Sequence, residues 1–170
     1  SLTLLDVSGL STRRVASIGE MFEGCYDLKR IIGLENFDTS NVDNMYTMFY
    51  DCNTLTSLDV SSFDTSKVTD MSNMFSGCKT LTSLNVSNFN TSNVTTMANM
   101  FYGCNSLTSL DVSNFDTTNV TDMSTMFIGC TNLKSIIGLD KFDTANVTNF
   151  ERMFSSCSKL TELDLSTFDT

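Results

Sequence analysis

Apolar residues recur along this chain at a fixed interval of about 26 residues. The unit that runs from Leu55 to Cys78, LTSLDVSSFDTSKVTDMSNMFSGC, is repeated with the same apolar offsets on both sides. One apolar column consists of Phe22, Phe49, Phe75, Phe101, Phe127 and Phe154, and another of Leu2, Leu28, Leu55, Leu81, Leu107, Leu133 and Leu160. A fixed period in the twenties is typical of repeat proteins, in which each unit buries its apolar face against the next. Since 170 residues divided by 26 gives about six and a half, the pattern predicts one domain over residues 1–170 made of that many coils.

The spacing within one unit predicts a strand, a turn and a short helix. Leu58 and Val60 alternate with polar residues, which predicts a short parallel strand with both side chains inward. The Phe-Asp-Thr-Ser segment predicts a turn, because an Asp side chain can bond to the backbone two residues on. Met71, Met74 and Phe75 follow at i, i+3 and i+4, the spacing of one face of a short α-helix or 3₁₀ segment. The expected fold class is therefore an α/β-type solenoid, a leucine-rich repeat with these three elements per coil.

Polar residues at the predicted helix ends agree with this assignment. The residue before the helical face is an N-cap former in six repeats, at Ser17, Asn44, Asp70, Thr96, Asp122 and Asn149. Glycine follows the helical stretch in four repeats, at Gly24, Gly77, Gly103 and Gly129, where a left-handed residue is favoured.

Two repeats are one residue longer than the others. They contain Ile31-Ile32-Gly33-Leu34 and Ile136-Ile137-Gly138-Leu139, and an extra residue beside a strand glycine predicts a β-bulge. Ile32 and Ile137 occupy a column that is polar and outward-facing in other repeats. Facing outward, they would be apolar contact points for a partner; a bulge could equally turn both inward.

Composition excludes several classes of function. The net charge is −10, with 20 acidic and 10 basic residues, whereas a nucleic-acid partner requires a basic surface. The chain has no His, which removes the commonest general base and metal ligand. No apolar run reaches the length of a membrane helix. We therefore expect no catalytic residue, no cofactor, no bound metal, no nucleic-acid partner and no membrane insertion by this segment.

The cysteines and aspartates have structural interpretations that compete with chemical ones. The six cysteines are 27, 26, 26, 26 and 27 residues apart, which predicts a column of buried thiols, although adjacent coils would also place them within disulfide range. Aspartates in the Phe-Asp-Thr-Ser column are expected to form turns. Calcium between the coils is the alternative, since oxygen ligands are abundant, but no known calcium-loop motif is present.

The pattern MFxGCxxLxxLDVSxFDTSxVTxM resembles the BspA-like leucine-rich repeats of bacterial surface proteins, and in particular their Mycoplasma-type branch, a domain of unknown function. The resemblance covers essentially all of the chain, with local departures at Leu10, Ile18, Asp51, Phe150 and Ser156. It implies a curved parallel-strand solenoid, extracellular display at a bacterial cell surface, and adhesion or protein binding. It implies no catalytic residue.

From these observations we expect a non-catalytic binding or adhesion module, whose partner is a host or neighbouring-cell surface protein or glycoprotein. The predicted contact residues lie on the strand face and are Ser57, Asp59, Ser83, Asn85, Ser109, Asp111, Asp164, Ile32 and Ile137. A structural spacer that displays another domain is the first alternative, because the middle repeats are nearly identical. Lattice binding to ice or polysaccharide is the second, suggested by the column Thr39, Thr65, Thr91, Thr117 and Thr144.

The chain also has the features of a piece of a longer array. Ser1 opens directly into a repeat with no signal peptide, and neither end has a polar capping repeat. Unpaired strand edges and apolar coils at such ends would allow the fragment to associate end to end.

Overall fold

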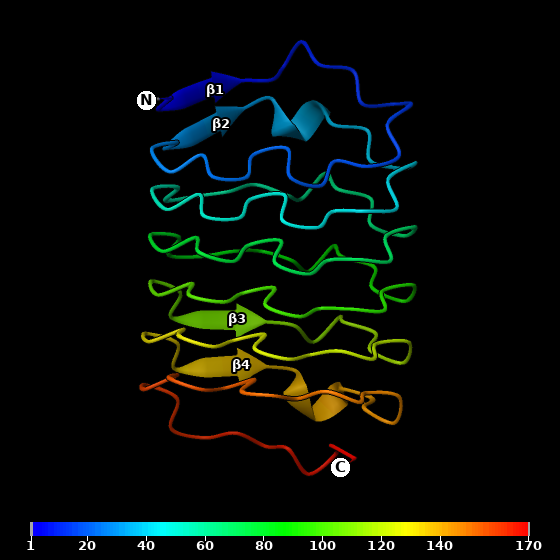
Figure 1. Ribbon diagram of the computed structural model, residues 1–170, viewed down its shortest axis with the longest axis vertical. Helices are drawn as coiled ribbons and strands as arrows, with labels where there is room; N and C mark the ends of the chain where they lie inside the picture. Colours follow the sequence, from blue (N-terminus) through cyan, green and yellow to red (C-terminus); the bar gives the residue numbers. More distant parts are fainter. Residues whose placement is uncertain (1, 170) are drawn as a thin grey trace.

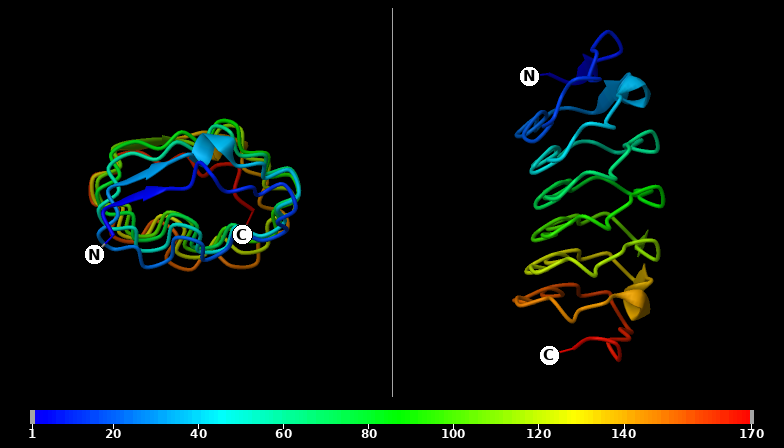
Figure 2. Two further views of the ribbon diagram at one scale, coloured as in Figure 1. Left: turned by 90° about the horizontal axis from the view of Figure 1, so that it is seen from above. Right: turned by 90° about the vertical axis from the view of Figure 1, so that its right-hand side faces the viewer.

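The computed structural model describes residues 2–169, and the chain winds through them as coils stacked along one axis (Figure 1). Viewed down this axis, successive coils overlie one another in a flattened ring (Figure 2). One long side of the ring carries the strands and is called the strand face here. The opposite long side, called the turn face, contains the Met-Phe-x-Gly-Cys segments and zigzags through consecutive turns.

Strands form in four coils, as two parallel pairs. β1 (Leu4–Asp6) pairs with β2 (Arg30–Ile32), and β3 (Ser109–Asp111) pairs with β4 (Ser135–Ile137). Between residues 2 and 169 the equivalent segments at 57–59, 83–85 and 162–164 do not form strands. The prediction of one parallel strand in every coil is therefore confirmed in part.

The extra residue of the two longer repeats does not produce the predicted β-bulge. It produces a left-handed glycine followed by a single 3₁₀ turn, η1 (Leu34–Asn36) after Gly33 and η2 (Leu139–Lys141) after Gly138. The two glycines have φ values of 93° and 95°, a conformation that side chains other than glycine rarely adopt. Leu34 and Leu139 are buried, so the 3₁₀ turn returns the chain to the core.

The predicted helix over Met71–Phe75 is wrong, and no α-helix occurs in the described part of the chain. Asn73 and Gly77 have φ values of 57° and 76°, and a left-handed residue every few positions cannot continue an α-helix. The segment instead forms consecutive turns, in which Met74 N donates to Met71 O at 3.2 Å and Ser76 N donates to Asn73 O at 3.0 Å. Met and Phe still point inward, because this chain of turns also has an apolar side.

The turn face is held together by backbone hydrogen bonds that run from coil to coil. One column comprises Phe22 N to Met48 O, Phe49 N to Met74 O, Phe75 N to Met100 O, Phe101 N to Met126 O and Phe127 N to Met153 O, all between 2.9 and 3.0 Å. The residues predicted as N-caps form a continuous series of parallel bridges along this face. They also cap: Asp70 Oδ1, for example, accepts a hydrogen bond from Ser72 N at 2.8 Å. Alternate amides of this segment therefore bond to the next coil, and those between them bond within their own turn.

The core consists of ladders of identical side chains. The rings of the Phe column stack with centroids 5.4 to 5.8 Å apart from Phe22 to Phe154. The cysteines are free thiols, and each of the last five donates to a Phe carbonyl of the preceding coil, as Cys78 Sγ does to Phe49 O at 3.3 Å. Burial raises the pKa of Cys52 and Cys130 to about 12. The prediction of a buried thiol column is confirmed.

Candidate binding face

The seven polar residues predicted for the strand face all have exposed side chains, and Ile137 is 52% exposed. The outward orientation expected of the two isoleucines is therefore confirmed for Ile137. Ile32 is only partly exposed. The strand face thus combines small polar side chains with exposed apolar residues near its two ends, Leu4 in β1 and Ile137 and Leu163 near the C-terminal end.

The aspartates of this face hold their own turns. Asp59 Oδ1 accepts a hydrogen bond from Ser61 N at 3.0 Å, and Asp111 Oδ1 accepts one from Ser113 N at 2.9 Å. Hydrogen bonding from these serines lowers the pKa of both carboxyl groups, because it favours the charged form. Each side chain is therefore a fixed, ionised carboxylate at the surface, as is Asp164, which Ser166 caps in the same way.

Two hollows open on the strand face, one after each of the longer repeats. The first, of about 230 Å³, is lined by Arg30, Ile31, Ile32, Leu34, Glu35, Ser57, Leu58 and Asp59. The second, of about 110 Å³, is lined by Ile136, Leu139, Asp140, Glu162, Leu163 and Asp164. The second set occupies the repeat positions of the first, and in both the Ile-Ile-Gly-Leu segment forms one wall.

The hollows lie where the longer repeats change the path of the backbone, on the side of β2 and β4 that has no paired strand. β2 pairs with β1 on its N-terminal side, and β4 pairs with β3, but neither pairs with the coil that follows it. The left-handed glycine and the 3₁₀ turn displace the backbone just beyond each isoleucine pair. The preceding coil fixes this path closely: a Cβ on Gly138 would lie 2.3 Å from Ser113 Cα.

Acidic and apolar side chains line both hollows, and polar atoms make up the larger share of the lining. Glu35 and Asp59 flank the first, and Asp140, Glu162 and Asp164 flank the second. None of these carboxylates forms an ion pair within residues 2–169, where the single pair found is Arg152 with Glu151. The negative charges of the hollows are therefore not neutralised internally.

The structure brings together some of the predicted contact residues and separates others. Ile32, Ser57 and Asp59 line the first hollow, and Asp164 lines the second. Asp111 pairs in register with Ile137 at the edge of the second hollow. Ser83, Asn85 and Ser109 are exposed on the coils between the hollows. Sequence reasoning missed Glu35, Asp140 and Glu162, although the first two follow directly after the Ile-Ile-Gly-Leu segments.

The threonine column that suggested lattice binding lies in the interior. Thr39, Thr65, Thr91, Thr117 and Thr144 are all at most 2% exposed. Each of the first four hydroxyls donates to a carbonyl of the next coil, as Thr65 Oγ1 does to Asn90 O at 2.9 Å. This column bonds coils to one another, so the reason for proposing a lattice surface there was wrong.

The turn face carries tyrosines that sequence reasoning overlooked. Tyr26, Tyr46 and Tyr102 are 57%, 37% and 45% exposed. The charge of Asp51 is the main cause of a raised pKa at Tyr50, and the charge of Glu23 contributes, so acidic groups surround this ring. Tyr50 and Tyr102 fill the variable position of Met-Phe-x-Gly-Cys, which could have identified them. Exposed tyrosines are common in interfaces, so this face is the main competitor of the strand face.

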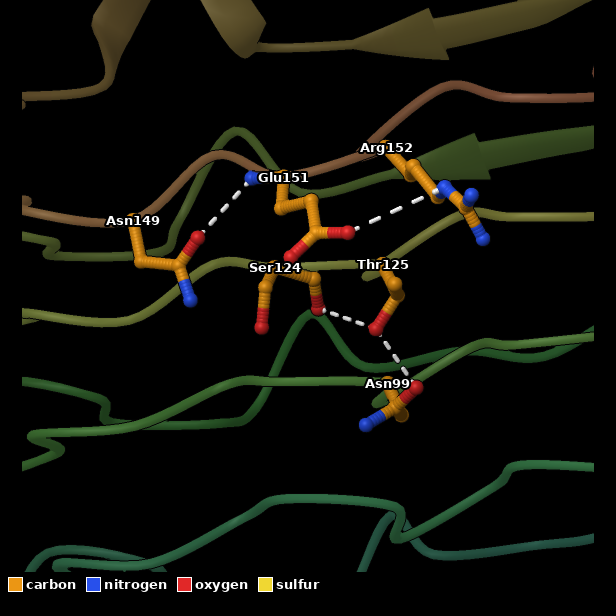
Figure 3. A network of polar contacts seen from close by, with 6 residues as sticks. All are labelled: Asn99, Ser124, Thr125, Asn149, Glu151 and Arg152. Atoms are coloured by element: carbon orange, nitrogen blue, oxygen red, sulfur yellow. Dashed lines mark hydrogen bonds and ion pairs between the residues drawn. The ribbon is translucent and has the colours of Figure 1, made fainter.

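Polar side chains near the C-terminal end of the turn face link neighbouring coils (Figure 3). The Thr125 hydroxyl lies 2.5 Å from Asn99 Oδ1 in the preceding coil. Glu151 and Arg152 form an ion pair at 3.8 Å with both side chains about 70% exposed, an arrangement that contributes little to stability. The cluster contains no paired nucleophile and base. We interpret the Thr125–Asn99 contact as a structural link between coils, while the contacts among Asn149, Glu151 and Arg152 lie within one coil.

Residues 2–169 contain neither a metal site nor a membrane-spanning helix. In the part of the chain that the structure describes, no three His, Cys, Asp or Glu side chains are grouped as a metal would require. Among the same residues, no helix is long and apolar enough to cross a bilayer.

Comparison with known proteins gives one match. A family model described as "Mycoplasma protein of unknown function, DUF285" matches residues 2–110 and 104–170. No curated protein and no solved structure matches the chain significantly.

Proposed function

The chain belongs to the family described as Mycoplasma protein of unknown function, DUF285, and we propose that it is a non-catalytic module that binds another macromolecule through its strand face. We further propose that it is a BspA-like leucine-rich-repeat solenoid, displayed at a bacterial cell surface. Its partner on this proposal is a surface protein or glycoprotein of a host or neighbouring cell.

The repetition of the hollow on the strand face is the observation that carries the proposal. A rod that served only as a spacer needs uniform coils, yet two coils depart from the repeat in the same way. Both departures place a left-handed glycine and a 3₁₀ turn beside an acidic hollow that isoleucine side chains line. Proteins normally cover unpaired strand edges and exposed apolar groups, so leaving them uncovered here favours a role in binding a partner.

A structural spacer is the second candidate function, and the turn face supports it. Hydrogen-bonded peptide columns and stacked Phe rings continue without a break through the middle coils. Such a ladder favours a stiff rod. The two functions are compatible if the rod presents its own strand face.

A capture experiment tests the binding function. The immobilised chain is exposed to extracts of host and bacterial surfaces, beside a variant with Ile137→Ser and Asp59→Asn and a control with Tyr46→Ser and Tyr102→Ser. The proposal predicts a partner that the native chain and the tyrosine control retain and the strand-face variant loses. Loss in the tyrosine control alone would transfer the site to the turn face. No specific retention at micromolar protein would favour the spacer.

A further inference from the structure

We propose that the two hollows are a matched pair of receptors for basic side chains, spaced to take two Lys or Arg residues of one extended polypeptide. This inference rests on the proposed function and specifies the chemistry of its partner. It is carried by the geometry, charge and duplication of the hollows.

Each hollow suits a Lys or Arg side chain in both of its parts. These residues have an apolar stem and a charged end, and they bury the stem while the end remains near water or an anion. Ile136, Leu139 and Leu163 supply apolar wall in the second hollow, while Asp140, Glu162 and Asp164 supply negative charge. In the first, Ile31, Ile32, Leu34 and Leu58 are the apolar residues and Glu35 and Asp59 the acidic ones.

The charge pattern disfavours an acidic partner. The chain has a net charge of −10, and the hollow carboxylates form no internal ion pair in the described residues. Arg30 lines the first hollow, so the second, with no basic lining residue, is expected to bind the cation more strongly. Like charge between an acidic partner and this face would oppose association.

The spacing defines how the partner lies. Ile31 and Ile136 occupy the same repeat position four coils apart. Paired strands are spaced at about 4.8 Å and the stacked Phe rings of successive coils at up to 5.8 Å, so the hollows are roughly 19 to 23 Å apart. An extended chain advances about 3.3 Å per residue, so six residues span about 20 Å. An even separation also places both side chains on the same side of the extended chain. The predicted ligand therefore has basic residues at i and i+6 and crosses Asn85 and Asp111 between the hollows.

The test uses two synthetic peptides of identical composition, built from Gly, Ser and Thr with two lysines. One has the lysines six residues apart and the other three residues apart. Binding to the whole chain is measured by calorimetry at low and physiological salt. Because the first peptide can occupy both hollows at once, it should bind at least about 10-fold more tightly than the second.

Matched variants separate the hollows from general electrostatic attraction. Glu35→Gln with Asp59→Asn removes two charges from the first hollow, and Asn85 shows that Asn can hold the same turn. Asp38→Asn with Asp64→Asn removes two charges from turn positions, where Asn90 is the natural equivalent. The inference predicts that the first variant lowers the affinity of the six-residue peptide to that of the three-residue peptide, and that the second leaves the preference unchanged.

Three outcomes would overturn the inference. These are equal affinity for the two peptides, no binding of either, and equal loss in the two variants. If the capture experiment still finds a partner that depends on the strand face, the binding function remains supported and only the proposal of a cationic partner is refuted. If that experiment also fails, both proposals fall.

Discussion

Removing one ring from the middle of the Phe ladder should destabilise this protein more than removing a ring from its end. Phe101 is fully buried and stacks on Phe75 at 5.8 Å and on Phe127 at 5.6 Å. Truncation of a buried Phe to Ala costs about 3–5 kcal/mol, and each lost aromatic pair adds about 0.5–1.5 kcal/mol. Because two aromatic pairs are lost, Phe101→Ala should lower the free energy of unfolding by about 4–8 kcal/mol.

The matched variant is Phe154→Ala at the C-terminal end of the same ladder. Phe154 is only partly buried and stacks on Phe127 alone, at 5.7 Å. Its loss should cost about 2 kcal/mol, since less apolar surface and one aromatic pair are removed. Urea unfolding followed by far-UV circular dichroism measures both values. In Phe101→Ala the transition should also broaden or split, because coils on the two sides lose their coupling. Equal costs in the two variants, or a cost below about 1 kcal/mol for Phe101→Ala, would refute this account of the ladder.

Four further substitutions test the backbone and the thiol column. Thr47 is a buried β-branched residue at φ 51° whose hydroxyl has no hydrogen-bond partner in the described structure. Because Asn tolerates this left-handed conformation better than Thr does, Thr47→Asn should raise the free energy of unfolding by about 1 kcal/mol in urea titrations. Burial raises the pKa of Cys52 from 9.0 to about 12. The contribution of this thiol to stability is therefore complete below pH 9 and falls by about 1.4 kcal/mol per pH unit between pH 9 and 12. Cys52→Ala should lessen the loss of stability in that interval, and an unchanged slope of stability against pH would contradict the pKa shift. Gly138→Ala should lower the free energy of unfolding by more than about 3 kcal/mol, because the added Cβ would collide with Ser113. The control is Gly103→Ala, which has φ 65° but open space around the added Cβ. It should lower the free energy of unfolding by about 1 kcal/mol, as measured by thermal unfolding.

The apolar columns and turn residues were predictable from the sequence because they depend on contacts that every repeat makes in the same way. In the inner coils the Phe, Met, Leu and Cys columns are buried as the 26-residue period predicted, whereas Leu2 and Met21 near the N-terminal end are exposed. The Asp-Thr-Ser turns are capped as predicted, with Ser66 N donating to Asp64 Oδ1 at 3.0 Å. These are local or nearest-coil interactions, so one unit contains all the information they need.

The helix prediction failed because the i, i+3, i+4 spacing is shared by two structures. A helix and a chain of consecutive turns both place Met71, Met74 and Phe75 on one side. The residues that distinguish the two structures are Asn73, between the two methionines, and Gly77, after Phe75, since both readily adopt the left-handed conformation. The same column contains Thr47 and Arg152, which conceal the signal in other repeats.

The hollows were only partly predictable because they depend on pairing between coils. The sequence identified the extra residue and the isoleucines, and therefore the correct location. It did not show that strand pairing would stop on one side of each extra residue and continue on the other. Glu162 and Asp164 belong to the repeat after the irregular one, and only the stacking of coils places them beside Ile136.

The central claim, that the strand face is the binding surface, is tested most directly by amide hydrogen exchange of the chain with and without the partner fraction that it captures. The account predicts slower exchange at residues 30–35, 57–59, 135–140 and 162–164, with the turn face unchanged. Protection confined to the turn-face segments around Tyr46, Tyr50 and Tyr102 would contradict it and place the binding surface on the opposite side of the coils.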